Sequence, residues 1–112
     1  MSDARLPISV LIPVKNDAEN LRECLRSVAF GDEIVVVDSG SRDQTAEVAE
    51  SAGARLVQFA WNGKYPRKKN WALENVPWRH EWVLIIDADE RITPALEAEI
   101  AAAVRRAEVD GF

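Results

Sequence analysis

The 112-residue sequence has a single cysteine, Cys24, and therefore cannot form an internal disulfide, which is typical of proteins from a reducing compartment. Its apolar runs are short, and none approaches the roughly 18 residues of a membrane-spanning helix. Residues 1–10 lack the long apolar stretch of a secretory signal peptide. These absences predict a cytoplasmic protein and leave open a peripheral contact with the inner face of the cytoplasmic membrane.

Basic residues are also few: 14 lysines and arginines stand against 19 acidic residues, and the formal net charge is −5. Proteins dedicated to nucleic acids need a basic face to neutralise phosphates, so this balance argues against nucleic acid as a partner. With 47% apolar and 29% charged residues, the chain has the composition of one globular domain and not of a disordered segment.

Four short runs rich in valine and isoleucine recur along the chain, at residues 8–14, 34–37, 56–59 and 82–86. The runs are nearly continuous and not alternating, which is typical of strands covered on both faces in a parallel sheet. Segments with helical spacing lie between them. The sequence therefore predicts an α/β fold, βαβαβαβα in order, with helices flanking a mostly parallel sheet.

Capping residues and glycines indicate where the first two helices begin and end. Asn16, in an N-x-x-E pattern, predicts the start of the first helix, and Gly31 predicts its end. Ser41 and Gln44 occupy capping-box positions for the second helix. Gly53 is expected to end that helix in the left-handed conformation.

The aromatic residues and the one histidine are assigned from their positions along the predicted strands. Trp71, Trp78 and Trp82 are expected in the core, whereas Trp61 follows the third strand and lies on the ligand side. His80 precedes the fourth strand. It is therefore expected at the surface, at the opposite edge of the sheet.

Polar residues follow every predicted strand. In open α/β sheets, ligands bind outside the carboxyl ends of the strands, because loops and helix N-termini converge there. The segments that follow the four strands are residues 13–16, 38–41, 60–64 and 87–90. Together they bring carboxylates, amides, a glycine-containing turn and basic residues to one edge, which is the mix that can hold a nucleotide and a metal-bound phosphate.

The strongest single signal is the pair Asp87 and Asp89, separated by one residue directly after the fourth strand. Two such carboxylates provide hard oxygen ligands for Mg²⁺ or Mn²⁺, and the ion can neutralise a leaving diphosphate. A bare D-x-D more often caps a turn in solvent, but its position after a parallel strand favours the ligand interpretation. Asp38 ends the second strand, where it can accept a hydrogen bond from a base or ribose.

Residues 64–70 contain four cations within six residues, ahead of a short predicted helix. Positive charge at a helix N-terminus suits a diphosphate. A solvated basic face explains any one of these side chains equally well. The cluster therefore indicates at least one phosphate contact without identifying the residue that makes it.

Four segments, in this order, resemble the nucleotide-sugar half of family 2 glycosyltransferases with the GT-A fold: PISVLIPVKN (7–16), IVVVDSGSRDQT (34–45), KNWAL (69–73) and VLIIDADE (83–90). The Asp-Ser-Gly-Ser and Asp-Ala-Asp-Glu-Arg runs are most similar to the bacterial branch of lipopolysaccharide-core glucosyltransferases. The resemblance covers nearly the whole chain and predicts a single donor-binding domain over residues 1–112, incomplete at its C-terminus.

The resemblance also implies roles for six residues at the strand ends. Pro13 and Asn16 would border the base pocket, Asp38 would hydrogen-bond the uracil, Lys69 would approach the diphosphate, Asp87 would hold the ribose or donor sugar, and Asp89 would ligate the divalent cation, Mg²⁺ or Mn²⁺.

By the same resemblance, the parent activity is an inverting, metal-dependent transfer from a nucleotide-sugar, UDP-linked, to a cell-envelope glycan, lipopolysaccharide or lipid-linked acceptor. The carboxylate base is expected beyond Phe112, so the isolated chain is expected to transfer sugar weakly or not at all.

Three other interpretations compete with the transferase. The chain could be a non-catalytic nucleotide-binding module or fragment that needs a partner half, and an apolar edge left bare would then favour self-association. A phosphatase with Asp87 as nucleophile is disfavoured because such enzymes place D-x-D after the first strand. A dinucleotide-binding unit is disfavoured because no G-x-G-x-x-G follows residues 8–14.

Overall fold

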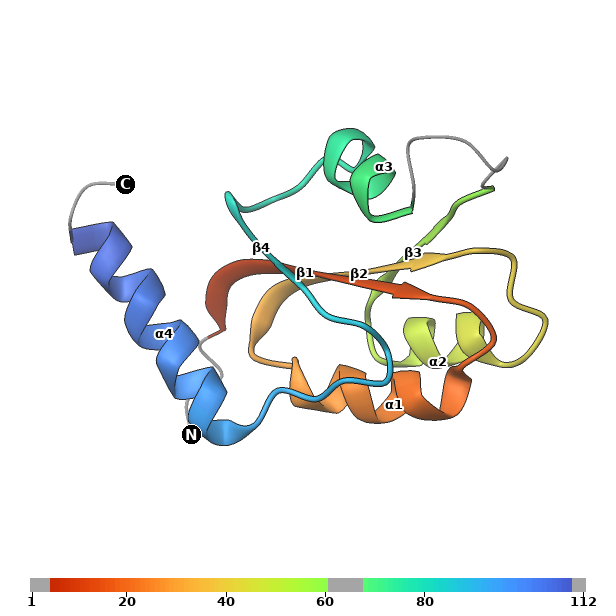
Figure 1. Cartoon of the computed structure of the whole chain (residues 1–112), viewed down its shortest axis with the longest axis horizontal. Coiled ribbons are helices and arrows are strands. Elements are labelled where there is room, and N and C mark those ends of the chain that lie inside the picture. Colours follow the sequence, from red (N-terminus) through yellow and green to blue (C-terminus); the bar gives the residue numbers. More distant parts are fainter. Residues whose placement is uncertain (1–4, 61–67, 110–112) are drawn as a thin grey trace.

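The computed structural model describes residues 5–60 and 68–109, and for residues 68–70, 108 and 109 it describes the backbone alone. Its elements are β1 (Leu6–Val14), α1 (Ala18–Ser27), β2 (Gly31–Asp38), α2 (Thr45–Ser51), β3 (Arg55–Gln58), α3 (Lys68–Asn75), β4 (Trp82–Ile85) and α4 (Pro94–Val109). The predicted βαβαβαβα order is confirmed. Figure 1 shows α1 and α2 on one face of the sheet and α3 on the other.

The four strands form one sheet in the order β3-β2-β1-β4, and each of the three pairings is parallel. Parallel neighbours need crossover connections, which α1, α2 and α3 provide. The predicted parallel α/β sheet is therefore confirmed. All four strands point the same way, so their carboxyl ends meet at one edge, marked in Figure 1 by the arrowheads of β1 and β2.

The core has two layers, because helices cover both faces of the sheet. Alternate side chains of a strand point to opposite faces. The layer beneath α1 and α2 contains Ile8, Val10, Ile12, Val14, Leu21, Cys24, Leu25, Val36, Val48 and Ala49. The layer beneath α3 contains Leu11, Val35, Val37, Phe59, Ala72 and Val76. Both sets of side chains need apolar neighbours, which explains the nearly continuous apolar runs in the sequence.

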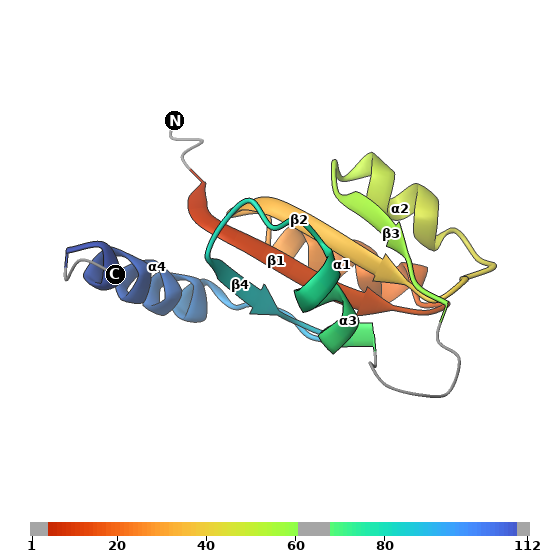
Figure 2. The ribbon, with the colours of Figure 1, turned by 90° about the horizontal axis from the view of Figure 1, so that it is seen from above.

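Helix α4 is attached to this core along one side. Val104 is buried in the layer beneath α1 and α2, whereas Leu96 is 40% exposed. Figure 2 shows α4 projecting away from the sheet. In the described ranges, 5–60 and 68–109, no helix combines the length and apolar character required to cross a membrane.

Asn16 does not cap α1 as predicted. Its backbone is left-handed, with φ 49°, and its Oδ1 accepts a hydrogen bond from the N–H of Arg42 at 2.7 Å. The carboxylate of Asp43 receives the N–H of Ala18 (3.1 Å) at the start of α1 and that of Thr45 (3.0 Å) at the start of α2. The hydroxyl of Thr45 and these amides outweigh desolvation and hold the pKa of Asp43 below its usual value.

Of the three remaining helix signals, Gly53 is confirmed, whereas Gly31 and the pair Ser41 and Gln44 do not act as predicted. Gly53 has φ 77° after α2, as predicted. Gly31 opens β2 and does not end α1; a Cβ there would lie 2.8 Å from Cγ2 of Val10, so glycine permits the close approach of β1 and β2. Gln44 precedes α2 without a side-chain capping bond, and the Ser41 hydroxyl bonds elsewhere.

The tryptophan predictions are correct for two residues and wrong for one. The ring of Trp71 packs on Phe59 with centroids 5.2 Å apart, and the indole N–H of Trp78 donates to the carbonyl of Ala72 at 3.2 Å. Trp82 is 46% exposed instead of lying in the core. It lies on β4, the last strand of the described sheet, so its position depends on strand order.

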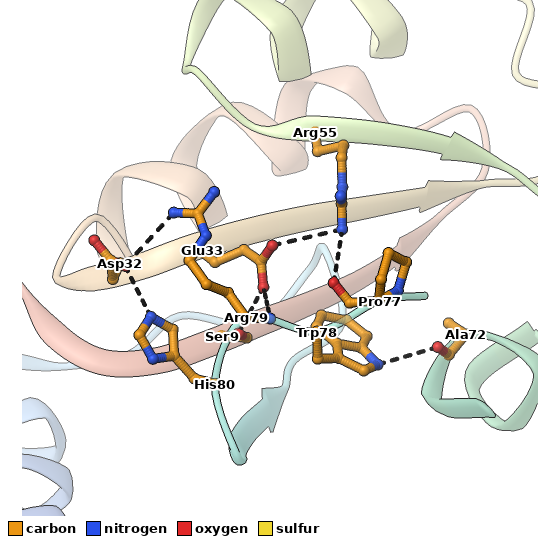
Figure 3. A network of polar contacts seen from close by, with 9 residues as sticks. All are labelled: Ser9, Asp32, Glu33, Arg55, Ala72, Pro77, Trp78, Arg79 and His80. Carbon is orange, nitrogen blue, oxygen red and sulfur yellow. Dashed lines mark hydrogen bonds and ion pairs between the residues drawn. The ribbon is translucent and has the colours of Figure 1, made fainter. Parts of the chain in front are cut away.

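His80 lies at the amino-terminal edge of the strands, as predicted, but its side chain is only 20% exposed. Its Nε2 lies 2.8 Å from Oδ2 of Asp32, and the guanidinium of Arg79 lies 3.6 Å from the same oxygen (Figure 3). These contacts, the bond to His80 first, hold the pKa of Asp32 below its usual value. The histidine therefore joins the segment before β4 to the start of β2, far from the strand ends.

Beside this pair, Glu33 is buried at the start of β2 (Figure 3). It accepts hydrogen bonds from the hydroxyl of Ser9 (2.8 Å) and the N–H of Arg79 (2.9 Å), and a guanidinium nitrogen of Arg55 lies 3.5 Å away. Burial opposes ionisation, but these contacts outweigh it, so the pKa of Glu33 lies below its usual value.

We expect Glu33→Gln to lower the free energy of unfolding at pH 7 by about 2 kcal/mol, because the buried donors lose a charged acceptor. A carboxyl whose folded pKa is depressed contributes stability above its unfolded pKa and loses it as pH falls through the folded pKa. The difference between the two proteins should therefore shrink below about pH 4. Urea unfolding at several pH values measures this difference, with Glu50→Gln as the control because Glu50 is exposed on α2. An equal difference at every pH would contradict the assignment.

Candidate functional site

The carboxyl ends of β2, β1 and β4 bring Asp38, Pro13 and Asp87 to one edge of the sheet. Val14 of β1 pairs in register with Asp38, and on the other side the N–H of Ile86 donates to the carbonyl of Leu11 at 3.0 Å. Neighbouring strands lie about 4.8 Å apart, so Asp38 and the turn that begins after Ile86 flank β1 at about 10 Å from one another. One elongated ligand could contact both.

Asp38 is 1% exposed, which is unusual for a carboxylate. Its Oδ2 accepts hydrogen bonds from the N–H of Ser41 (3.1 Å) and from Nε2 of Gln58 (2.9 Å), and its Oδ1 accepts the hydroxyl of Ser41. Each oxygen of an ionised carboxylate can accept about two hydrogen bonds. Oδ2 is therefore fully used, whereas Oδ1 keeps one acceptor position.

The loops after β1 and β2 are joined around this carboxylate. The N–H of Asn16 donates to Oγ of Ser41 at 2.7 Å, so the hydroxyl proton of Ser41 is directed to Asp38. The side-chain oxygen of Asn16 is used for the amide of Arg42 in the second loop. Asparagine tolerates left-handed backbone better than most residues, which suits it to this position. Asn16 thus lies beside Asp38 as a residue that joins two loops.

The turn after β4 is held by its own residues and by α1. The N–H of Glu90 donates to the carbonyl of Asp87 (2.9 Å), and the carboxylate of Glu90 accepts the N–H of Asp87 (2.8 Å). The guanidinium of Arg91 donates to the carbonyl of Ala88 (2.8 Å) and to Oδ1 of Asn20 (3.0 Å). These bonds define the backbone from which Asp89 projects.

Asp89 is exposed at this turn, and Asp87 is half-buried. Behind them, Sγ of buried Cys24 lies 3.7 Å from the carbonyl of Asp87. Burial is the main cause that raises the pKa of Cys24 to about 11, so the thiol is protonated and donates to that carbonyl. Cys24 therefore supports the turn and is not a nucleophile at neutral pH.

Among the residues described, no three histidine, cysteine or acidic side chains are grouped as a metal cage. Mg²⁺ and similar hard cations are commonly held by one or two carboxylates together with substrate phosphates. The exposed carboxylate of Asp89 fits an arrangement in which substrate phosphates supply the other ligands. A cation at this turn would therefore need a phosphate-bearing ligand to complete its shell.

Three sequence-based assignments concern residues or side chains that the structure does not describe. Trp61, residues 64–67 of the basic cluster, and the side chain of Lys69 lie outside the described residues, although the backbone of Lys69 belongs to α3. A groove of about 510 Å³ lies between α1 and α2, away from the strand ends. Its lining includes Arg22 and Arg26 but none of the predicted site residues.

Sequence reasoning missed Gln58 and the role of Arg91. Gln58 ends β3 and pairs in register with Asp38. Aligning the predicted strand ends would have paired Val37 with Phe59, whereas the structure pairs Val37 with Val57, so no sequence signal identified this contact. Arg91 acts on residues of its own turn and on a helix residue 71 positions away, and no local pattern predicts the second contact.

The family model of glycosyl transferase family 2 matches residues 9–112. An uncharacterized glycosyltransferase of Rickettsia bellii is 42% identical over 94 residues, which are 83% of this chain and 31% of that protein. The lipopolysaccharide core biosynthesis glycosyltransferase LpsC of Rhizobium meliloti is 40% identical over 97 residues, covering 82% of this chain and 35% of LpsC.

A similar solved structure is glucosyl-3-phosphoglycerate synthase from Mycobacterium tuberculosis in complex with Mn²⁺, uridine diphosphate and glucosyl-3-phosphoglycerate. It matches with a TM-score of 0.52 and 25% identity, over 84% of this chain and 39% of that protein. The chain spans about a third of the length of the curated relatives it matches. The predicted family resemblance is confirmed, and the chain belongs to glycosyl transferase family 2.

Proposed function

We propose that this chain binds the nucleotide of a UDP-sugar and forms the donor-binding part of an inverting, metal-dependent glycosyltransferase. The observation that carries the proposal is the buried Asp38, whose Oδ2 is saturated while Oδ1 keeps one acceptor position. The imide N–H of uracil is a donor that matches this acceptor. Cytosine presents an unprotonated ring nitrogen at the same place, which an acceptor-only carboxylate rejects.

Asp87 and Asp89 are proposed to act at the other end of the donor. About 10 Å separates two strands that flank a third, so a nucleotide with its base at Asp38 can extend across β1 to the turn after β4. Asp87 would hold the ribose or sugar, and Asp89 would share a Mg²⁺ or Mn²⁺ with the diphosphate. When bound, this ion would stabilise the negative charge of the leaving diphosphate. The Mn²⁺ and uridine diphosphate in the similar synthase structure support this assignment.

Pro13 and Lys69 complete the proposed donor contacts, Pro13 at the end of β1 beside the base and Lys69 at the diphosphate. The catalytic base is proposed to lie outside these 112 residues. Glu90 closes the turn after β4, and Glu97 and Glu99 belong to α4, which extends away from the strand ends (Figure 1). The isolated chain should therefore bind donor more readily than it transfers sugar.

The acceptor is proposed to be a cell-envelope glycan or a lipid-linked glycan, on the basis of the similarity to LpsC. A cytoplasmic location with peripheral membrane contact is part of the proposal. Self-association is proposed to involve β4, where Trp82 and Ile85 are 46% and 39% exposed.

Calorimetric titration of the folded chain with UDP, with and without Mn²⁺, tests the proposal. We expect Mn²⁺ to strengthen the binding of UDP, because Asp89 and the diphosphate each supply only part of a coordination shell. CDP serves as the matched ligand, since it carries the same diphosphate and ribose on a base without the imide N–H. A chain that is folded by circular dichroism but binds UDP under neither condition would contradict the proposed function.

A further inference from the structure

Gln58, at the end of β3, lies directly opposite Asp38 in the register of the two parallel strands. Its Nε2 donates to Oδ2 of Asp38 at 2.9 Å, and its Oε1 accepts the N–H of Gly40 at 3.2 Å. The two partners define the orientation of the amide, because an ionised carboxylate only accepts and a backbone N–H only donates. One side chain therefore contacts both the buried acid and the glycine of the loop that follows it.

These two bonds restrict motions that would otherwise be available to the loop. The terminal torsion of an aspartate has a broad distribution, so neighbouring groups decide where its oxygens point. Ser41 contacts both oxygens of Asp38 from within the same loop, whereas Gln58 contacts Oδ2 from a different strand. Gly40, with φ 71° and an exposed position, is tied to β3 through the same amide.

We propose that Gln58 is a positioning residue for nucleotide recognition, which holds the Asp38 carboxylate and the Gly40 amide so that one acceptor faces the base. This inference rests on the proposed function, since it assigns the base to Asp38. Gln58 is itself exposed at the end of β3, so it acts on the nucleotide through Asp38 and contributes little apolar burial to the fold.

Gln58→Glu provides a test with a signature that a purely structural residue would not give. Among the described residues, the titratable group that is hydrogen-bonded to the side-chain amide of Gln58 is Asp38. Two carboxylates at hydrogen-bond distance cannot both ionise easily, so the pair would share a proton at a raised apparent pKa. With that proton bound, the introduced glutamic acid offers a donor to Asp38 and a carbonyl oxygen to Gly40, as glutamine does.

We expect Gln58→Glu to bind UDP about tenfold more weakly than wild type at pH 8, once the shared proton is lost, and nearly as well as wild type at pH 5.5, while that proton is bound. Affinities are compared as the ratio of variant to wild type at each pH, which cancels the titration of the ligand's own phosphate. Gln58→Leu should bind about tenfold more weakly at both pH values, because it restores neither bond.

Gln44→Glu is the matched control, because Gln44 is exposed before α2 and forms no side-chain capping bond. The ratio of the UDP affinity of Gln44→Glu to that of wild type should not change with pH. Thermal unfolding of all variants establishes that they are folded at both pH values. If wild type binds UDP and the ratio for Gln58→Glu is independent of pH, the positioning role is refuted while the proposed function stands. If folded wild type does not bind UDP, the proposed function and the role that depends on it both fail.

Discussion

Asp38→Asn is expected to weaken UDP binding about a hundredfold and to reverse the base preference in favour of CDP. The reason is the donor arrangement around the acid. The N–H of Ser41 and the amide of Gln58 both point to Oδ2, so the single oxygen of asparagine will occupy that side. Its NH₂ then replaces Oδ1, and it opposes the imide N–H of uracil but matches the ring nitrogen of cytosine.

Calorimetry with UDP and CDP, each with Mn²⁺, measures this reversal. Asp32→Asn removes one negative charge at the opposite edge of the sheet and controls for net charge, since Asp32 contacts His80 and Arg79 there. Circular dichroism and thermal unfolding verify that the variants are folded. An equal loss for the two nucleotides would show that Asp38 supports the loop without reading the base. Unchanged UDP binding would remove Asp38 from the site altogether.

Asp89→Ala is expected to lower UDP affinity about a hundredfold in the presence of Mn²⁺ and to leave the affinity without metal unchanged. Asp89 is exposed, and the bonds that shape its turn belong to Glu90 and Arg91, so the substitution should not alter the fold. The variant should therefore lose only the increase in UDP affinity that Mn²⁺ provides.

Titrations with and without Mn²⁺, on wild type and variant, separate these outcomes. Glu97→Ala, at an exposed position of α4, is the control for removing an acidic side chain away from the strand ends. A variant that retains metal-enhanced binding would contradict the role of Asp89 as a ligand. A variant that loses affinity equally in both conditions would indicate that Asp89 contacts the nucleotide or the fold directly.

The two ends of the proposed donor site differ in burial and in hydrogen bonding, so the two substitutions need different measurements. Asp38 is buried and receives donors from its own loop and from β3. Asp89 is exposed on a turn that is closed mainly by its immediate neighbours. Substitution of Asp38 therefore changes a network and needs a test of base preference, whereas substitution of Asp89 removes one carboxylate and needs a test of metal dependence.

The sequence by itself determined the alternation of strands and helices, because apolar periodicity is a local property that each segment carries. It also placed Asp38, Asp87 and the turn with Asp89 at the strand ends, since parallel strands share one carboxyl edge. The left-handed glycine after α2 is equally local and was predicted correctly.

Other features were decided only by the tertiary structure. Asn16 and Ser41 have the side chains of helix caps, but Asn16 accepts the N–H of Arg42, 26 residues away, and Ser41 accepts the N–H of Asn16, 25 residues away. The Ser41 hydroxyl donates to Asp38, so neither side chain caps a helix. Trp82 is exposed because the order β3-β2-β1-β4 leaves its strand last in the described sheet. Gln58 meets Asp38 because β3 pairs with β2 in one register. Strand order and register depend on which distant segments pack together, and a local pattern does not contain that information.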